Sequence, residues 1–61
     1  MILKIYTISL VCGVDEMPDG QWRVHAVAAS GNDECEFDLL YDTEDEAKAI
    51  RKGNFFSIQV A

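Results

Sequence analysis

Positive charge is scarce in this chain of 61 residues. It has five lysines and arginines against eleven aspartates and glutamates, so its net charge is −6. Proteins that bind nucleic acid or an anionic membrane need basic side chains that face phosphates. The composition therefore argues against nucleic acid and membranes as direct partners. It favours attraction to a basic surface on another protein.

Cysteine and histidine are also few. The two cysteines, Cys12 and Cys35, do not form a CxxC motif. Together with the single histidine, His25, they supply too few ligands for zinc. Residues 1–12 are apolar, but Lys4 interrupts them, no cleavage motif follows, and the run is too short to cross a bilayer. We therefore expect no metal, no cofactor, no signal peptide and no membrane span. We also expect a cytoplasmic protein with reduced thiols.

The chain is short enough for one domain, residues 1–61, and its 49% of apolar residues suffice for a core. Two thin layers leave little room for a deep catalytic cleft. Ser9, His25 and Asp38 form a nominal catalytic set on an open sheet face, with no oxyanion hole or pocket. We therefore expect no enzyme and assign no catalytic residue.

Strand-forming residues alternate with turn signals in the order β-β-β-α-β. The sequence predicts an α+β fold, with a four-stranded, mostly antiparallel sheet and one helix on one face. The spatial order 3-2-1-4 is expected, with the last strand parallel to the first or third. Asp42 or Thr43 is predicted to cap the helix, Thr43–Glu46 fits a capping box, and Gly53 is placed to end the helix. The predicted strands are 2–12, 21–29, 34–41 and 55–60.

A two-residue turn at Gly31-Asn32 would fix the register of the central hairpin. The residue numbers of each facing pair then add up to 63, so that Ala26 faces Phe37 and His25 faces Asp38. A slip of one residue would place carboxylates opposite core residues, and the pattern therefore enforces this pairing. In the first strand, the inward face is predicted to carry Tyr6, Ile8, Leu10 and Cys12. Cys35 is predicted to lie on the same face as Cys12. The two cysteines are on strands separated by the second strand, and their Cα atoms are therefore too far apart for a disulfide.

Acidic side chains are concentrated in residues 33–46, which hold eight of the eleven carboxylates and no lysine or arginine. Alternate acids on the third strand would lie about 6.6 to 7 Å apart, roughly the advance of two phosphates along a DNA strand. The row is our candidate surface for a basic partner, including a nucleic-acid enzyme inhibited by mimicry. The alternatives are solubility and protection of a sheet edge. The candidate partner-binding residues are Glu34, Glu36, Asp38, Asp42, Glu44 and Asp45.

The face of the first strand opposite the core is apolar as well. An uncovered apolar patch is typical of an interface and would allow two copies to pair about a two-fold axis. We therefore hold a second interpretation, a dimeric regulatory subunit that acts through this face. The candidate dimer-interface residues are Leu3, Ile5, Val11 and Val27.

One segment resembles known modules. Leu40-Tyr-Asp-Thr-Glu-Asp-Glu-Ala-Lys-Ala-Ile50 is similar to the strand-to-helix passage of HicB-type antitoxins, which also have β-β-β-α-β topology. It also resembles integrase arm-binding domains, which are basic, whereas this chain is acidic. The Pro-Gly-Cys segment of the antitoxins has no counterpart here, and we assign no family. The resemblance makes an antitoxin-like role one form of the dimeric interpretation.

Overall fold

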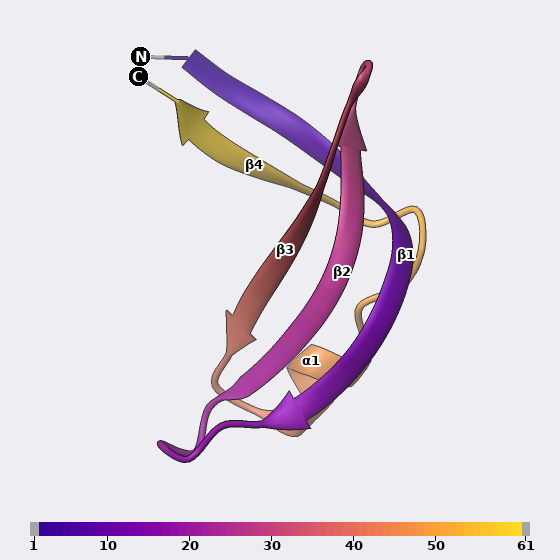
Figure 1. The fold of residues 1–61 in the computed structure, drawn as a ribbon. Coiled ribbons are helices and arrows are strands. Elements are labelled where there is room, and N and C mark those ends of the chain that lie inside the picture. The colour runs from indigo at the N-terminus through magenta and orange to yellow at the C-terminus, as the bar shows by residue number, and fades with distance from the viewer. Residues whose placement is uncertain (1, 61) are drawn as a thin grey trace.

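The computed structural model describes residues 2–60, which form one four-stranded sheet and one short helix (Figure 1). The strand order is β3-β2-β1-β4, as expected, and every neighbouring pair is antiparallel. β3 and β4 are therefore the two edges. The elements are β1 (Ile2–Glu16), β2 (Trp22–Ser30), β3 (Asp33–Tyr41), α1 (Glu44–Lys48) and β4 (Phe55–Val60).

The hairpin of β2 and β3 has the predicted register without a shift. Nine pairs run from Ser30 opposite Asp33 to Trp22 opposite Tyr41. Gly31 has φ +62° and no residue other than glycine has positive φ within residues 2–60, so only the first turn residue uses this conformation. A two-residue turn with glycine first suits the right-handed twist of the two strands. The turn and the alternating pattern thus specify the same pairing.

The inward face predicted for β1 is wrong beyond Ile8. The β1–β2 register shifts between Ile8 and Leu10 and again between Val11 and Gly13. Each shift is a bulge that inserts one unpaired residue and turns the following side chains to the other face. Val11 therefore packs against the core, whereas Leu10 is 56% exposed and Cys12 is exposed.

The predicted direction of β4 is also wrong. β4 runs antiparallel to β1, from Phe55 opposite Thr7 to Val60 opposite Ile2. A parallel strand would require a crossover that returns along the whole sheet. α1 has only five residues, and backbone bonds between residues 53–54 and Ile8 then attach the chain to the middle of β1. From there the chain continues away from α1 (Figure 1).

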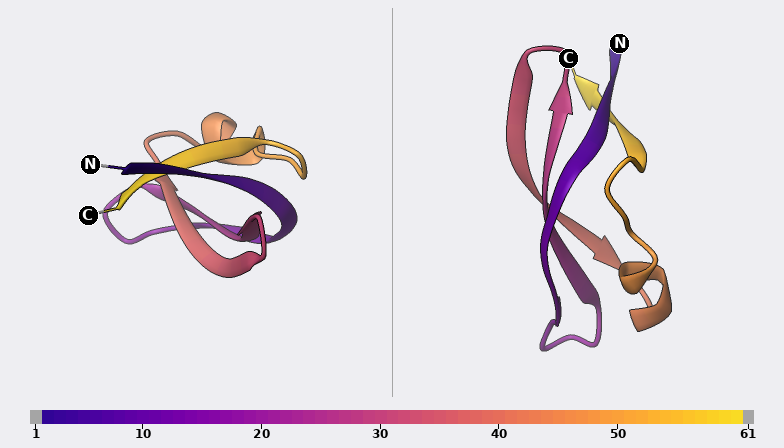
Figure 2. Two further views of the ribbon diagram at one scale, coloured as in Figure 1. Left: turned by 90° about the horizontal axis from the view of Figure 1, so that it is seen from above. Right: turned by 90° about the vertical axis from the view of Figure 1, so that its right-hand side faces the viewer.

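The core lies on the concave side of the sheet, which we call the inner face. The sheet is strongly curled (Figure 2), so that aromatic side chains from β1 and both edge strands meet. The ring centroid of Phe37 lies 4.9 Å from that of Tyr6 and 5.1 Å from that of Phe56. Cys35 was expected in this core but is exposed, because it lies on an edge strand close to the hairpin turn. The fully or nearly fully buried residues are Tyr6, Ile8, Val24, Ala26, Ala28 and Ala47.

Thr43, one of the two cap residues that the sequence allowed, is the N-cap of α1. Its hydroxyl accepts a hydrogen bond from the backbone N–H of Glu46 at 3.2 Å. Ala47 is completely buried in the core cluster, and Ile50 packs against that cluster. The helix ends at Lys48, well before Gly53, which instead adopts φ +94° in the turn that leads to β4. A single capped turn thus places Ala47 in the core.

Replacing the cap should destabilise the protein measurably. We expect Thr43→Ala to lower the free energy of unfolding by about 1 kcal/mol, because the backbone N–H of Glu46 loses its acceptor. Thr43→Ser keeps the hydroxyl and should change stability by a few tenths of a kcal/mol at most. Urea unfolding followed by circular dichroism measures both. Equal stability of the alanine and serine variants would contradict the role of the cap.

Candidate functional site

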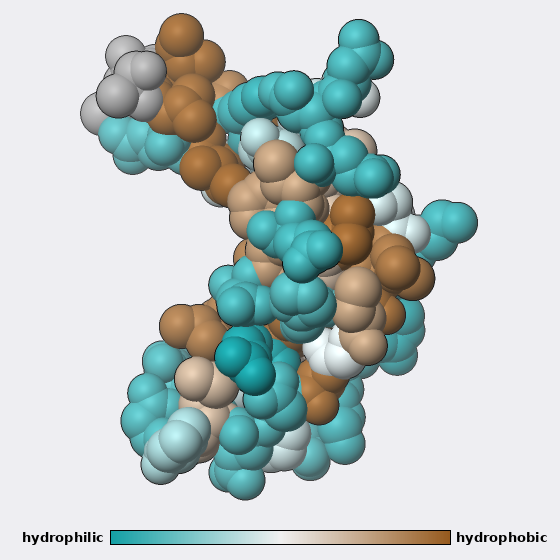
Figure 3. All heavy atoms as spheres, viewed as in Figure 1, coloured by the Kyte–Doolittle hydropathy of each residue, from teal (hydrophilic) through white to brown (hydrophobic). Residues whose placement is uncertain are grey.

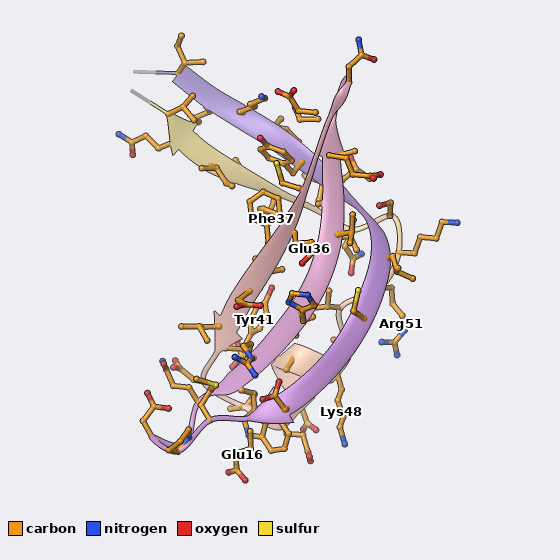
Figure 4. The ribbon with its side chains drawn as sticks, viewed as in Figure 1. Glu16, Glu36, Phe37, Tyr41, Lys48 and Arg51 are labelled. Atoms are coloured by element: carbon orange, nitrogen blue, oxygen red, sulfur yellow. The ribbon has the colours of Figure 1, made fainter. Side chains whose placement is uncertain are left out.

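Three carboxylates project from the convex side of β3, which we call the outer face. Glu34, Glu36 and Asp38 are all exposed, with 72% of the Glu36 side chain and 53% of the Asp38 side chain accessible. The next residue, Phe37, packs on the inner face, so Glu36 and Phe37 point to opposite sides of the strand (Figure 4). The acidic row therefore lies on the outer face of an edge strand, as the register predicted.

His25 on β2 lies beside two members of this row. Its Nδ1 atom is 2.6 Å from Asp38 Oδ1, and its Nε2 atom is 3.4 Å from Glu36 Oε2. The hydrogen bond to Asp38 is the main cause that raises the pKa of His25 above 6.5. The same bond lowers the pKa of the Asp38 carboxyl below 3.8. His25, when protonated, thus offsets part of the negative charge of the row, and the nearby Arg23 also acts on Asp38.

Ser9 is not hydrogen-bonded to His25 in the described residues. Ser9 occupies the first bulge of β1, and its hydroxyl donates to the backbone oxygen of Val27 at 3.2 Å. His25 bonds to Asp38 and approaches Glu36 instead. The three groups of the nominal set therefore do not form a relay.

The His25–Asp38 pair should shift the imidazole pKa and make the stability of the protein depend on pH. We expect the imidazole pKa, followed by NMR, to lie above 6.5 and to fall in Asp38→Asn, because the principal partner of the charged ring is removed. The raised His25 pKa contributes stability that is complete below pH 6.5 and is lost as pH rises through the folded-state pKa. The lowered Asp38 pKa contributes stability above about pH 4, which is lost as pH falls through the folded-state pKa. An unchanged imidazole pKa in Asp38→Asn would contradict this assignment.

The lysines and arginines of the described residues form their ion pairs outside the row. Within residues 2–60, Lys4 pairs with Asp33, Arg23 with Asp15 and Lys48 with Glu44. None of these pairs involves a row carboxylate. Surface ion pairs of this kind contribute about 0 to 1 kcal/mol each. The row carboxylates thus have no lysine or arginine in an ion pair, although Arg23 is near enough to contribute to the lowered pKa of the Asp38 carboxyl.

The three other predicted binding residues lie where β3 ends and α1 begins. Asp42 accepts a long hydrogen bond from the Gln21 side chain at 3.5 Å, and Glu44 pairs with Lys48 at 3.1 Å. Asp45 is exposed in the first turn of α1. Hydrophilic atoms cover much of the face shown in Figure 3, both over β3 and at the end that holds α1. Asp42 and Asp45 thus remain available, whereas Glu44 is already partnered.

An exposed apolar patch adjoins the row on the outer face, over β1 and β4. Leu3 is 66% exposed, Ile5 57% and Phe55 73%, and the alternation within paired strands places all three on this face. Leu10 and Val27 face each other on the same side. Val11 was predicted here and is wrong, because the first bulge turns it into the core.

Sequence reasoning missed Phe55 and Leu10 in this patch. A signal for Phe55 was present, since strand alternation must turn one of Phe55 and Phe56 outward. The sequence gives no such signal for Leu10, because odd-numbered and even-numbered residues around the bulges are both apolar.

Other chemistry-bearing groups are dispersed. Residues 2–60 enclose no pocket and contain no group of three potential metal ligands. Cys12 and Cys35 are both free. No helix in the described part of the chain is long and apolar enough to cross a bilayer.

Comparison with protein-family models, with curated proteins and with solved structures finds no match to this chain.

Proposed function

We propose that this protein is a small non-enzymatic interaction module that binds a basic surface of a partner protein through Glu34, Glu36 and Asp38. The observation that supports the proposal is a row of exposed carboxylates with no lysine or arginine of the chain paired to it. Asp42 and Asp45 would extend the contact, and Glu44 would do so after exchanging Lys48 for a partner cation. An inhibitor that occupies a nucleic-acid site is the most specific form of this function. We place its action in the cytoplasm, where both thiols would stay reduced.

Electrostatic complementarity would speed association with the partner and provide much of the specificity of binding. Such binding weakens as salt rises, because mobile ions screen exposed charges over about 8 to 10 Å at physiological ionic strength. Binding should also strengthen above the pKa of His25, because the neutral ring no longer offsets the negative charge of the carboxylates beside it.

The experiment is affinity capture from the native host with matched variants. Glu34→Gln/Glu36→Gln removes two charges from the row. Glu16→Gln/Asp19→Asn removes two from the exposed end of β1 and the loop that follows it, and the asparagine side chain can still accept the hydrogen bond from the Gln21 N–H. Both variants change the net charge from −6 to −4. We expect the row variant to lose a salt-sensitive partner by roughly tenfold and the loop variant by much less. Equal losses would mean that bulk charge alone is sensed. Displacement of the protein from its partner by duplex DNA would support nucleic-acid mimicry.

The second candidate is a homodimer that buries the apolar patch, and the 73% exposure of Phe55 favours it. Phe55 lies opposite Thr7 and diagonal to Ile5, and so large an exposed aromatic is unusual for a small monomer. Raising salt should strengthen such a dimer, since it screens the repulsion between two chains of charge −6. Sedimentation of the wild type and of Phe55→Ser at several concentrations tests this candidate. A wild-type monomer at millimolar concentration contradicts it.

A further inference from the structure

We propose that the free edge of β3 binds an extended segment of the partner protein as an additional strand, and that this segment alternates lysine or arginine with apolar residues. The inference rests on the proposed function and specifies its partner. The observations that carry it are the unpaired backbone of β3, the regularity of that strand and the different chemistry of its two faces.

β3 has a strand neighbour on one side only. It pairs with β2, and its Cα atoms all stay more than 8 Å from those of β4. Paired strands lie about 4.8 Å apart, so β4 does not occupy the β3 edge even though Phe37 and Phe56 touch on the inner face. Within residues 2–60, no backbone hydrogen bond outside the β2–β3 ladder involves β3. The outward-pointing groups of a nine-residue strand are therefore available.

The turn geometry shows which groups these are. In a two-residue hairpin, the residues that flank the turn, here Ser30 and Asp33, exchange both hydrogen bonds, and bonded and non-bonded pairs then alternate along the strands. The backbone N–H and C=O of residues 35, 37 and 39 consequently point toward β2. Those of Glu34, Glu36 and Asp38 point to the open edge. The residues that offer a partner their backbone are thus the same ones whose side chains carry the negative charge.

β3 lacks most of the features that keep edges from pairing. It contains no proline, no lysine and no register shift over its nine pairs with β2, whereas β1 has two bulges. Its charges are the one obstacle, and their sign is selective. Two copies of β3 paired about a two-fold axis would set carboxylates of the row against one another, which is destabilising. A segment with basic residues at those positions would gain from the same charges.

The occupant must suit both faces. Its outward side chains would lie beside the acidic row, where lysine or arginine is favoured. Its inward side chains would lie beside exposed Cys35 and half-buried Phe37 and Leu39, where apolar groups would cover partly exposed core. Strand addition uses main-chain hydrogen bonds for affinity and alternate side chains for selectivity. An extended segment with this alternation therefore matches β3 along its length.

The test uses a synthetic probe, the peptide Lys-Val-Lys-Val-Lys-Val-Lys with blocked ends, added to the full chain. We expect the backbone amides of residues 35, 37 and 39 to be protected from hydrogen exchange before peptide is added, and those of Glu34, Glu36 and Asp38 to exchange quickly. Saturating peptide should slow exchange of the three outward amides by at least about tenfold. The same peptide with every internal amide N-methylated keeps its charge and side chains, and we expect it to lose that protection.

A protein variant provides the complementary measurement. Glu36→Pro removes one outward donor without removing a β2–β3 hydrogen bond, and Glu36→Gln is its control for charge. We expect the proline variant to bind the peptide at least about tenfold more weakly than the glutamine variant. If the proline variant does not fold, the N-methylated peptide decides the question on the wild type.

The outcomes separate the two proposals. Peptide binding without protection of the Glu34, Glu36 and Asp38 amides overturns strand addition and leaves a charge-only contact with the row. Failure of the alternating peptide to bind also overturns it. The proposed function fails separately, if the host partner is captured equally well by the row variant Glu34→Gln/Glu36→Gln and by the wild type.

Discussion

Reversing the row, Glu34→Lys/Glu36→Lys/Asp38→Lys, should abolish capture of a basic partner while the protein stays folded. Each reversal adds two charges, so the net charge rises from −6 to 0 and attraction becomes local repulsion. Like charges set against each other at an interface cost several kcal/mol, which corresponds to a loss of more than about a hundredfold in affinity. Backbone circular dichroism should stay unchanged, because all three side chains point into solvent.

The effect of the triple reversal on stability needs its own control variant. Asp38→Lys removes the partner of His25, so a modest loss of stability is expected from that substitution alone. Asp38→Asn removes the same ion pair without reversing charge, and the two effects are thereby separated. Binding retained at wild-type affinity in the folded triple variant would exclude the row as the interaction surface.

Tyr6→Ala should destabilise the fold far more than loss of the Thr43 cap or of the His25–Asp38 pair. Tyr6 is 7% exposed, and its ring lies 4.9 Å from Phe37 and 6.0 Å from Phe56, so it joins the two edges of the curled sheet. Replacing a buried aromatic residue by alanine costs about 3 to 5 kcal/mol. A chain of this length has a total stability of roughly 3 to 9 kcal/mol. We therefore expect Tyr6→Ala to be largely unfolded or to melt about 15 to 30 °C lower than the wild type.

Phe55→Ala is the matched control for this core prediction. It removes an aromatic ring of similar size from a side chain that is 73% exposed. Its effect on stability should stay within about 0.5 kcal/mol. Thermal unfolding followed by circular dichroism compares the two variants directly. Equal losses of stability would mean that the inner and outer faces of the sheet are assigned incorrectly.

The part of the fold that the sequence predicted well is the part where two signals coincide. Acids alternate with apolar residues in β3, every second residue of β2 from Trp22 to Ala28 is apolar, and a glycine-containing turn joins the two strands. Both the alternation and the turn require the same register, and a one-residue slip would bury carboxylates. The acidic row, its exposure and the His25–Asp38 contact all follow from that register.

The errors lie where the sequence carries no alternation or depends on distant contacts. Ile8, Leu10 and Val11 are apolar at both parities, so a strand with bulges and a regular strand have the same hydrophobic pattern. The direction of β4 depended on a helix expected to reach Gly53. That helix ends at Lys48, and residues 53–54 then bond to Ile8 on β1, a contact that local propensity does not reveal.

The most direct test of the central claim is an NMR titration of the isotopically labelled protein with the partner captured from its host. We expect the largest changes in amide chemical shift at residues 34–38 and at His25, and we expect added salt to reverse them. Largest changes at Leu3, Ile5 and Phe55, strengthened by salt, would contradict the claim and move the interaction to the apolar patch.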